Sequence, residues 1–71
     1  MPFVEIKVIE GVFDANEKQD MITRVTETMI EIEGEAMRPV TMVTVEEVRS
    51  GSWGIGGKAM TTKDVKDLRA S

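Results

Sequence analysis

The first part of the chain carries a strand pattern, a long helix pattern and a second strand pattern, in that order. Apolar and polar residues alternate from Phe3 to Glu10, as in a strand with two different faces. Apolar residues then recur at helical spacing within 15–33, and a segment rich in Val and Thr follows at 40–48. Two strands joined by such a helix pair in parallel with a right-handed crossover. The sequence therefore predicts a small α+β subunit built on one βαβ unit.

Local signals set the expected ends of these elements. Asp14 and Glu17 have the spacing of a capping box, and Gly34 is placed to end the helix, which is expected over most of 15–33. Pro39 is expected to introduce the second strand at 40–48. The helix face predicted to pack on the sheet consists of apolar residues, namely Met21, Ile22, Val25, Met29 and Ile32.

Parallel pairing has a consequence for the start of the chain. The N-terminal ends of two parallel strands lie at the same edge of a sheet. Pro2 and the stretch 38–42 are therefore expected to lie near one another. Lys7 projects from the mixed face of the first strand, where an interface salt bridge is its expected role.

The C-terminal part is short and rich in glycine. Residues 50–57 predict a tight turn or short hairpin. Thr61 and Asp64 have the spacing of a second capping box, followed by Val65 and Leu68 on one face of a short helix. Arg49 lies by the turn and is expected to be solvated. No linker or repeat divides the chain, so residues 1–71 form one predicted domain.

Size and composition favour self-association. A core this small rarely supplies more than about 3–5 kcal/mol of folding stability unless disulfides, a bound metal or oligomerisation add to it. The chain has no Cys and no His, so disulfides are excluded, the usual ligands of a structural zinc site are missing, and no metal is expected. Two strands covered by one helix also leave one sheet face bare. Oligomerisation is therefore the source of additional stability that remains.

Charge limits the classes of partner. Thirteen acidic and nine basic residues give a net charge of −4, without a basic cluster. Binding to nucleic acid or to an anionic membrane is therefore not expected. No apolar run approaches the ~20 residues of a membrane span, and the N-terminus lacks the pattern of a secretory signal. A cytoplasmic location is expected.

Pro2 is the candidate catalytic residue. Without His or Cys the chain has no triad, thiol nucleophile or imidazole base. Methionine before proline is normally removed, which leaves a secondary amine at the chain terminus. An apolar, cationic site would lower the pKa of that amine toward neutrality, where it could act as a general base. The alternative is that Pro2 is an ordinary first residue of a strand, where no ladder donor is lost.

The order of these features resembles one known family. Residues 1–11 (Met-Pro-Phe-Val-Glu-Ile-Lys-Val-Ile-Glu-Gly), a helix containing Lys18, and Trp53-Gly-Ile-Gly-Gly together resemble the 4-oxalocrotonate tautomerase family. The resemblance implies a βαβ subunit that dimerises and assembles into a homo-hexamer, a trimer of dimers. It also implies that Pro2 shuttles a proton between carbon and oxygen of a 2-hydroxydienoate or related keto acid, without a cofactor. Trp53 occupies the aromatic position that helps to shape the family's active site.

Two positions depart from the family pattern. The best-known members carry arginines where this chain has Val12 and, by our alignment, Met42. Those arginines bind the carboxylate and carbonyl oxygens of a diacid, so their loss puts 4-oxalocrotonate itself in doubt as a substrate. Arg38 is the candidate substitute because a guanidinium binds carboxylate in bidentate fashion, although it could equally be an exposed residue between helix and strand. Met42 is then a candidate pocket-lining residue.

Three functional hypotheses follow. The first is a tautomerase, an isomerase acting on a small keto or enol acid. The second keeps the same site for hydration, dehalogenation or decarboxylation of an unsaturated acid. The third is a non-catalytic oligomer that has kept the fold.

Overall fold

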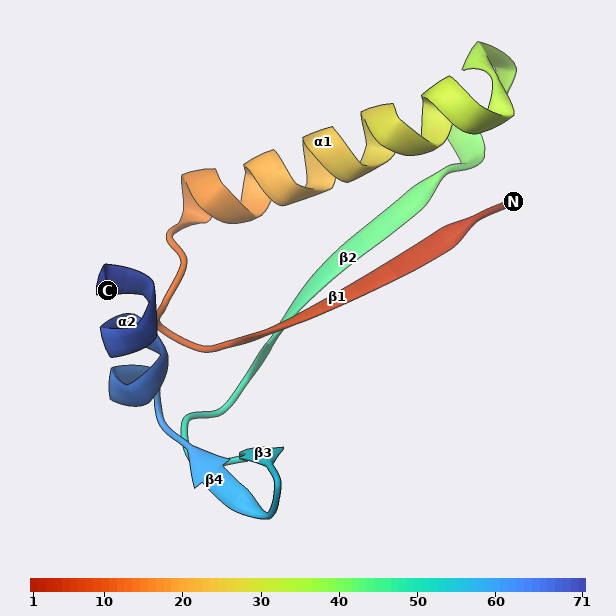
Figure 1. Cartoon of the computed structure of the whole chain (residues 1–71). Helices are drawn as coiled ribbons and strands as arrows, with labels where there is room; N and C mark the ends of the chain where they lie inside the picture. The colour runs from red at the N-terminus through yellow and green to blue at the C-terminus, as the bar shows by residue number, and fades with distance from the viewer.

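The fold consists of two strands and a long helix followed by a hairpin and a short helix. The computed structural model describes all 71 residues. The chain follows the order β1 (Phe3–Ile9), α1 (Ala15–Glu33), the 3₁₀ helix η1 (Glu35–Val40), β2 (Met42–Val48), β3 (Trp53–Ile55), β4 (Lys58–Met60) and α2 (Thr62–Ala70). This is the predicted α+β arrangement with a C-terminal hairpin and short helix (Figure 1). No helix combines the length and the apolar character needed to cross a membrane.

Strands β1 and β2 pair in parallel, as predicted. Their register runs from Phe3 opposite Met42 to Ile9 opposite Val48. The Met42 amide also donates a hydrogen bond to the Pro2 carbonyl at 3.1 Å. The expected neighbourhood of Pro2 and the start of the second strand is therefore confirmed.

Helix α1 begins and ends where its capping signals predict. The Glu17 amide donates to Asp14 Oδ1 at 2.8 Å, and the Asp14 amide donates to Glu17 Oε1 at 3.1 Å. At the other end Gly34 has φ = +103°, a value that suits glycine, and its amide donates to the Ile30 carbonyl at 2.9 Å. The same reciprocal capping box forms between Thr61 and Asp64 at the start of α2.

The second strand begins two residues later than predicted. Residues 35–40 form η1 with Pro39 inside it, so the prediction that Pro39 introduces a strand at Val40 is wrong. The fixed φ of proline fits a helical turn, and the Thr41 hydroxyl closes η1 by donating to the Met37 carbonyl at 2.8 Å. Strand geometry is reached only at Met42.

Helix α1 covers one face of the sheet and leaves the other open. Only Ile9, Val12 and Ile30 are buried in the whole chain, and each keeps a few per cent of its surface exposed. On the open face Phe3 and Met42 are 53% and 47% exposed. Ile32, predicted to pack on the sheet, is 76% exposed because it lies in the last turn of α1, where no residue of this subunit covers it.

The hairpin and α2 lie at the opposite end of the subunit from the N-terminus (Figure 1). Trp53 pairs with Met60 and Ile55 with Lys58, around a turn at Gly56 and Gly57, which both have positive φ. The Thr62 hydroxyl donates to the Glu10 carbonyl at 2.6 Å and so ties α2 to the end of β1.

Gly11 is a specific requirement of this junction. Its φ is +78°, and a Cβ there would lie 3.1 Å from Thr62 Cγ2. We expect Gly11→Ala to lower the free energy of unfolding by about 1–2 kcal/mol, because an alanine at positive φ is strained and crowds α2. Urea unfolding at fixed protein concentration measures this. The control is Gly54→Ala, since Gly54 has open space around it and no positive φ. An equal loss in both variants would contradict this explanation.

Candidate active site

Pro2 stands at the exposed start of β1. Its residue is half-buried and its carbonyl accepts the Met42 amide, so the ring has a defined place at the sheet edge. Met1 is 83% exposed and is therefore accessible for removal. While Met1 is attached, the Pro2 nitrogen is an amide with no basicity. Removal of Met1 turns the same atom into a secondary amine.

Two apolar residues of the open face, Phe3 and Met42, are the backbone neighbours of Pro2 at this sheet edge. Phe3 follows it directly and lies opposite Met42 in the register of the sheet. The structure thus brings together Pro2 and Met42, two of the four residues predicted for the site.

Arg38 is held by two carboxylates of its own subunit. Its Nη1 and Nη2 donate to the two oxygens of Glu27 at 2.6 and 3.0 Å, and its Nε and Nη2 donate to Glu35 at 2.7 and 3.1 Å. Four of the five guanidinium hydrogens are therefore engaged. These bonds lower the pKa of Glu27 and of Glu35 and raise the pKa of Arg38. Arg38 as an acid ligand stays a prediction, and it would have to release one carboxylate first.

Trp53 lines an apolar cavity at the far end of the subunit. The cavity has a volume of about 300 Å³, and Lys7 is the one lining residue that is not hydrophobic. The apolar lining includes Ile9, Phe13, Met60 and Leu68. Ile9 lies seven positions after Pro2, which at about 3.3 Å per residue is roughly 23 Å of strand. Within one subunit, Pro2 and Trp53 therefore do not share a site.

The position after Glu10-Gly11 belongs to the core. Val12 is only 9% exposed, so the side chain at this position packs inside the subunit. Lys7 pairs with Glu46 at 3.0 Å on the open face, within its own subunit, and its predicted interface role stays a prediction. Arg49 is exposed, as expected.

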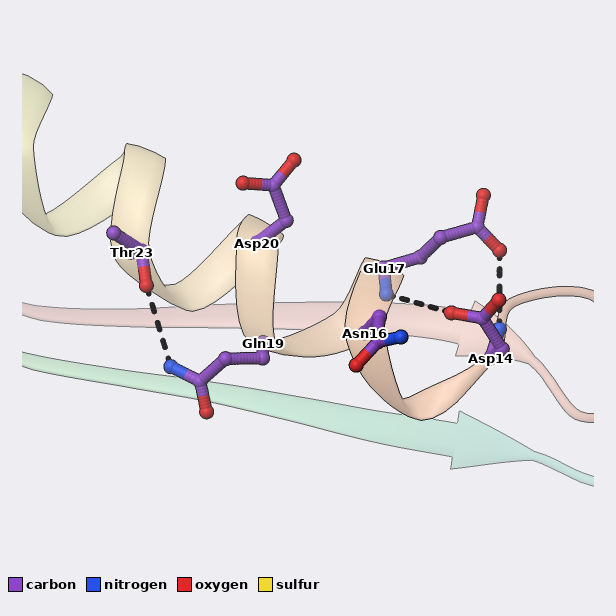
Figure 2. A pocket seen from close by; sticks show the side chains of 6 residues that line it. All are labelled: Asp14, Asn16, Glu17, Gln19, Asp20 and Thr23. Carbon is purple, nitrogen blue, oxygen red and sulfur yellow. Dashed lines mark hydrogen bonds between the residues drawn. The ribbon is translucent and has the colours of Figure 1, made fainter.

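A second hollow lies along the first turns of α1 (Figure 2). Its lining is entirely polar, and the hydrogen bonds drawn there are those of the Asp14–Glu17 capping box and a bond from Gln19 to Thr23. With Asp20 it presents three carboxylates and no cation, so it would repel an acid. Neither these carboxylates nor any other three His, Cys, Asp or Glu residues of the chain lie close enough together to hold a metal ion.

Sequence reasoning missed Arg69. This residue of α2 pairs with Glu17, and its guanidinium carbon lies 4.7 Å from the centre of the Phe13 ring. The helix itself was predictable from its capping box. No local signal connects residues that are 52 positions apart, so the Arg69–Glu17 pair could not be predicted from the sequence.

Comparison with known proteins decides the family. A family model described as "Tautomerase enzyme" matches residues 2–63. The chain belongs to the tautomerase family. It is accordingly an enzyme of the isomerase class, and it is similar to the 4-oxalocrotonate tautomerases in both sequence and fold.

Individual relatives of this tautomerase agree with that assignment. It is 33% identical to the probable tautomerase K2 of Dickeya dadantii, over 89% of this chain and 92% of the relative. It is 39% identical to the 2-hydroxymuconate tautomerase of Pseudomonas putida, over 80% of this chain and 87% of the relative. A solved 4-oxalocrotonate tautomerase isozyme from Methylibium petroleiphilum superposes with a TM-score of 0.71 at 31% identity, over 90% of this chain and 97% of that one.

The Arg38 cluster of this tautomerase predicts a pH dependence of stability. The pKa values of Glu27 and Glu35 are lowered from 4.5 in the folded state, so their contribution is present above about pH 4.5 and is lost as pH falls through the lowered values. Arg38→Gln should lower the thermal midpoint at pH 7, and its difference from wild type should shrink between pH 4.5 and 3. Thermal unfolding at one protein concentration measures both effects. Arg49→Gln is the control. A difference in thermal midpoint between Arg38→Gln and wild type that stays constant down to pH 3 would contradict a stabilising role of the Arg38 cluster.

Proposed function

We propose that this tautomerase transfers a proton between carbon and oxygen of a small keto or enol acid, with Pro2 as the general base after Met1 is removed. The observation that carries the proposal is the placement of Pro2, fixed at the sheet edge by the Met42 amide beside an apolar pair of side chains. The names of the relatives from Pseudomonas putida and Bacillus subtilis, both 2-hydroxymuconate tautomerases, support a substrate of the 2-hydroxydienoate type.

The chemistry needs one group that both accepts and returns a proton. The free amine of Pro2 takes the proton from the enol oxygen, and the electron pair of that O–H bond forms the carbonyl. The protonated amine then delivers its proton to the carbon terminus of the enol or dienol, which restores the free base. An α-amino group has a pKa of about 7.7–8.0, and apolar surroundings lower it, so both forms are accessible near neutral pH.

A complete site requires more than one subunit. Trp53, proposed as a wall of the site, lies at the opposite end of β1 from Pro2, so it would serve the Pro2 of a neighbouring copy. Met42 is proposed to line the same site beside Pro2. Arg38 remains the acid ligand predicted from sequence, with Glu27 and Glu35 as its competitors.

The surface supports a homo-hexamer, a trimer of dimers. Three buried residues make a very small core for a chain of 71 residues. Large apolar side chains remain exposed at both ends, namely Phe3, Met42, Ile55 and Leu68. Assembly would cover the open face of the sheet and bring the two ends of different subunits together.

The role of Pro2 predicts the kinetics of one substitution. Processed wild-type protein should convert enol phenylpyruvate to its keto form with kcat/KM rising through the pKa of the amine. Pro2→Ala leaves a primary amine of different geometry, and kcat should fall about 100-fold or more, as expected for loss of a positioned base. Pro39→Ala, at the other proline of the chain, is the control and should keep most of the activity. Equal rates in the two variants would remove Pro2 from the mechanism, and an inactive wild type would favour the non-catalytic hypothesis.

The assembly is tested separately. Sedimentation velocity at micromolar concentration should show a hexamer of 7.9 kDa subunits. Phe3→Lys places a charge on the open face and should dissociate it, whereas Glu31→Lys on the exposed side of α1 should not. A stable, folded wild-type monomer would contradict the proposed architecture.

A further inference from the structure

Glu33, the last residue of α1, has a carboxylate that its own subunit does not satisfy. The residue is half-buried, and its Oε1 is buried without a hydrogen-bond partner. Its Oε2 lies 3.1 Å from the Thr41 hydroxyl, but that hydroxyl has a single hydrogen and also lies 2.8 Å from the Met37 carbonyl. Glu33 takes part in none of the ion pairs of the chain. A buried carboxylate oxygen without a donor is costly, so this position calls for a partner.

Pro2 and this carboxylate lie at the same end and on the same side of the sheet. The register pairs Phe3 with Met42, so one position earlier Pro2 stands opposite Thr41, which has extended backbone geometry. Side chains alternate along a strand, so Pro2 and Thr41 lie on the face that α1 covers, away from the exposed Phe3 and Met42. The last turn of α1 and the N-terminus lie at the same end of the subunit (Figure 1). Thr41 is therefore both the residue opposite Pro2 and the hydrogen-bond neighbour of Glu33.

Removal of Met1 creates a hydrogen-bond donor at this place. While Met1 is attached, the Pro2 nitrogen carries no hydrogen. After its removal the nitrogen is tetrahedral, with two hydrogens in the protonated form and with one hydrogen and one lone pair in the neutral form. Processing thus supplies, close to Glu33, the kind of group that its carboxylate lacks.

The other charged groups of this end are engaged elsewhere. Arg38 of η1 is bound to Glu35 and to Glu27 of α1. Glu5 is the first charged residue of β1, and it is exposed on the open face, opposite Thr44. No charged residue of β2 precedes Glu46. Glu33 is thus the carboxylate that approaches Pro2 from the helix side.

We propose that Glu33 is a positioning residue for Pro2, whose processed amine donates a hydrogen bond to Glu33 Oε1. This inference rests on the proposed function of Pro2 as the general base. In the neutral amine the single N–H points to Glu33, which directs the lone pair away from α1, toward the open face and the substrate. In the protonated amine the second N–H is the one that returns to the substrate carbon, and Glu33 remains a carboxylate throughout.

The charge of Glu33 gives the proposal a direct readout. A neighbouring carboxylate favours the protonated amine, and so opposes the lowering of its pKa that apolar surroundings cause. The chain has two prolines, and the nitrogen of Pro39 is an amide that does not titrate. In processed protein labelled with ¹⁵N-proline, NMR therefore follows the titration of the Pro2 amine alone.

Glu33→Gln keeps the shape of the side chain and removes its charge. It should lower the pKa of the Pro2 amine by about 1 or more, as expected for loss of an adjacent opposite charge. The rise of kcat/KM with pH should move to lower pH by the same amount. At its plateau kcat should fall about threefold or more, because a less basic amine is a weaker general base.

Two controls accompany this variant. Glu31→Gln removes the same charge from the exposed side of the same helix and should leave the pKa of the Pro2 amine and kcat unchanged. In protein that retains Met1 the Pro2 nitrogen should not titrate at all.

The outcomes separate this inference from the proposed function. In an active enzyme, an unchanged pKa of the Pro2 amine in Glu33→Gln would overturn the pairing and leave Pro2 as the base. An equal fall of that pKa in Glu31→Gln would mean a long-range effect of net charge and would also overturn it. A fall confined to Glu33→Gln in a protein without tautomerase activity would support the pairing and overturn the proposed function instead.

Discussion

Seven residues of β1 pair in parallel with seven residues of β2, and the placement of the other elements depends on this pairing. Parallel strands need a crossover, which α1 supplies on one face of the sheet. The pairing also sets Met42 beside Pro2, since the Met42 amide continues the ladder by donating to the Pro2 carbonyl. At the other end the Glu10 amide donates to the Val48 carbonyl, which fixes the junction that carries α2. Pro2, the proposed catalytic base, is thus positioned by a backbone hydrogen bond.

The same architecture divides the subunit into two chemically different ends. One end presents Pro2 and, on the open sheet face, the exposed side chains of Phe3 and Met42. The other presents Trp53, the apolar cavity and Arg69. With the two ends roughly 23 Å apart along β1, one small acid cannot contact both ends of the same subunit. The exposed apolar surface that makes an isolated subunit unfavourable is also the surface through which copies could bring the two ends together.

The sequence predicted those parts of the fold that are specified locally. The Asp14–Glu17 and Thr61–Asp64 capping boxes involve residues three positions apart, so their spacing was sufficient to place α1 and α2. The prediction that Pro39 introduces a strand was wrong because Pro39 lies inside η1. The ion pair between Arg38 and Glu27 holds η1 to α1. The prediction that Ile32 packs on the sheet was wrong because periodicity gives the face of a helix but not how far the sheet extends beneath that face. The Arg69–Glu17 pair and the cavity beside Phe13 join segments far apart in the chain, and no pattern in the sequence indicates them.

The central claim is that a secondary amine at Pro2 carries the chemistry of this tautomerase. The most direct measurement compares processed protein with protein that retains Met1, each verified by intact mass, in the same enol-to-keto assay. Retention of Met1 changes the Pro2 nitrogen from an amine to an amide, while Met1 itself is exposed and packs little against the fold. The account predicts that the Met1-retained protein is folded and assembled but nearly inactive. Equal rates for the two forms would contradict it.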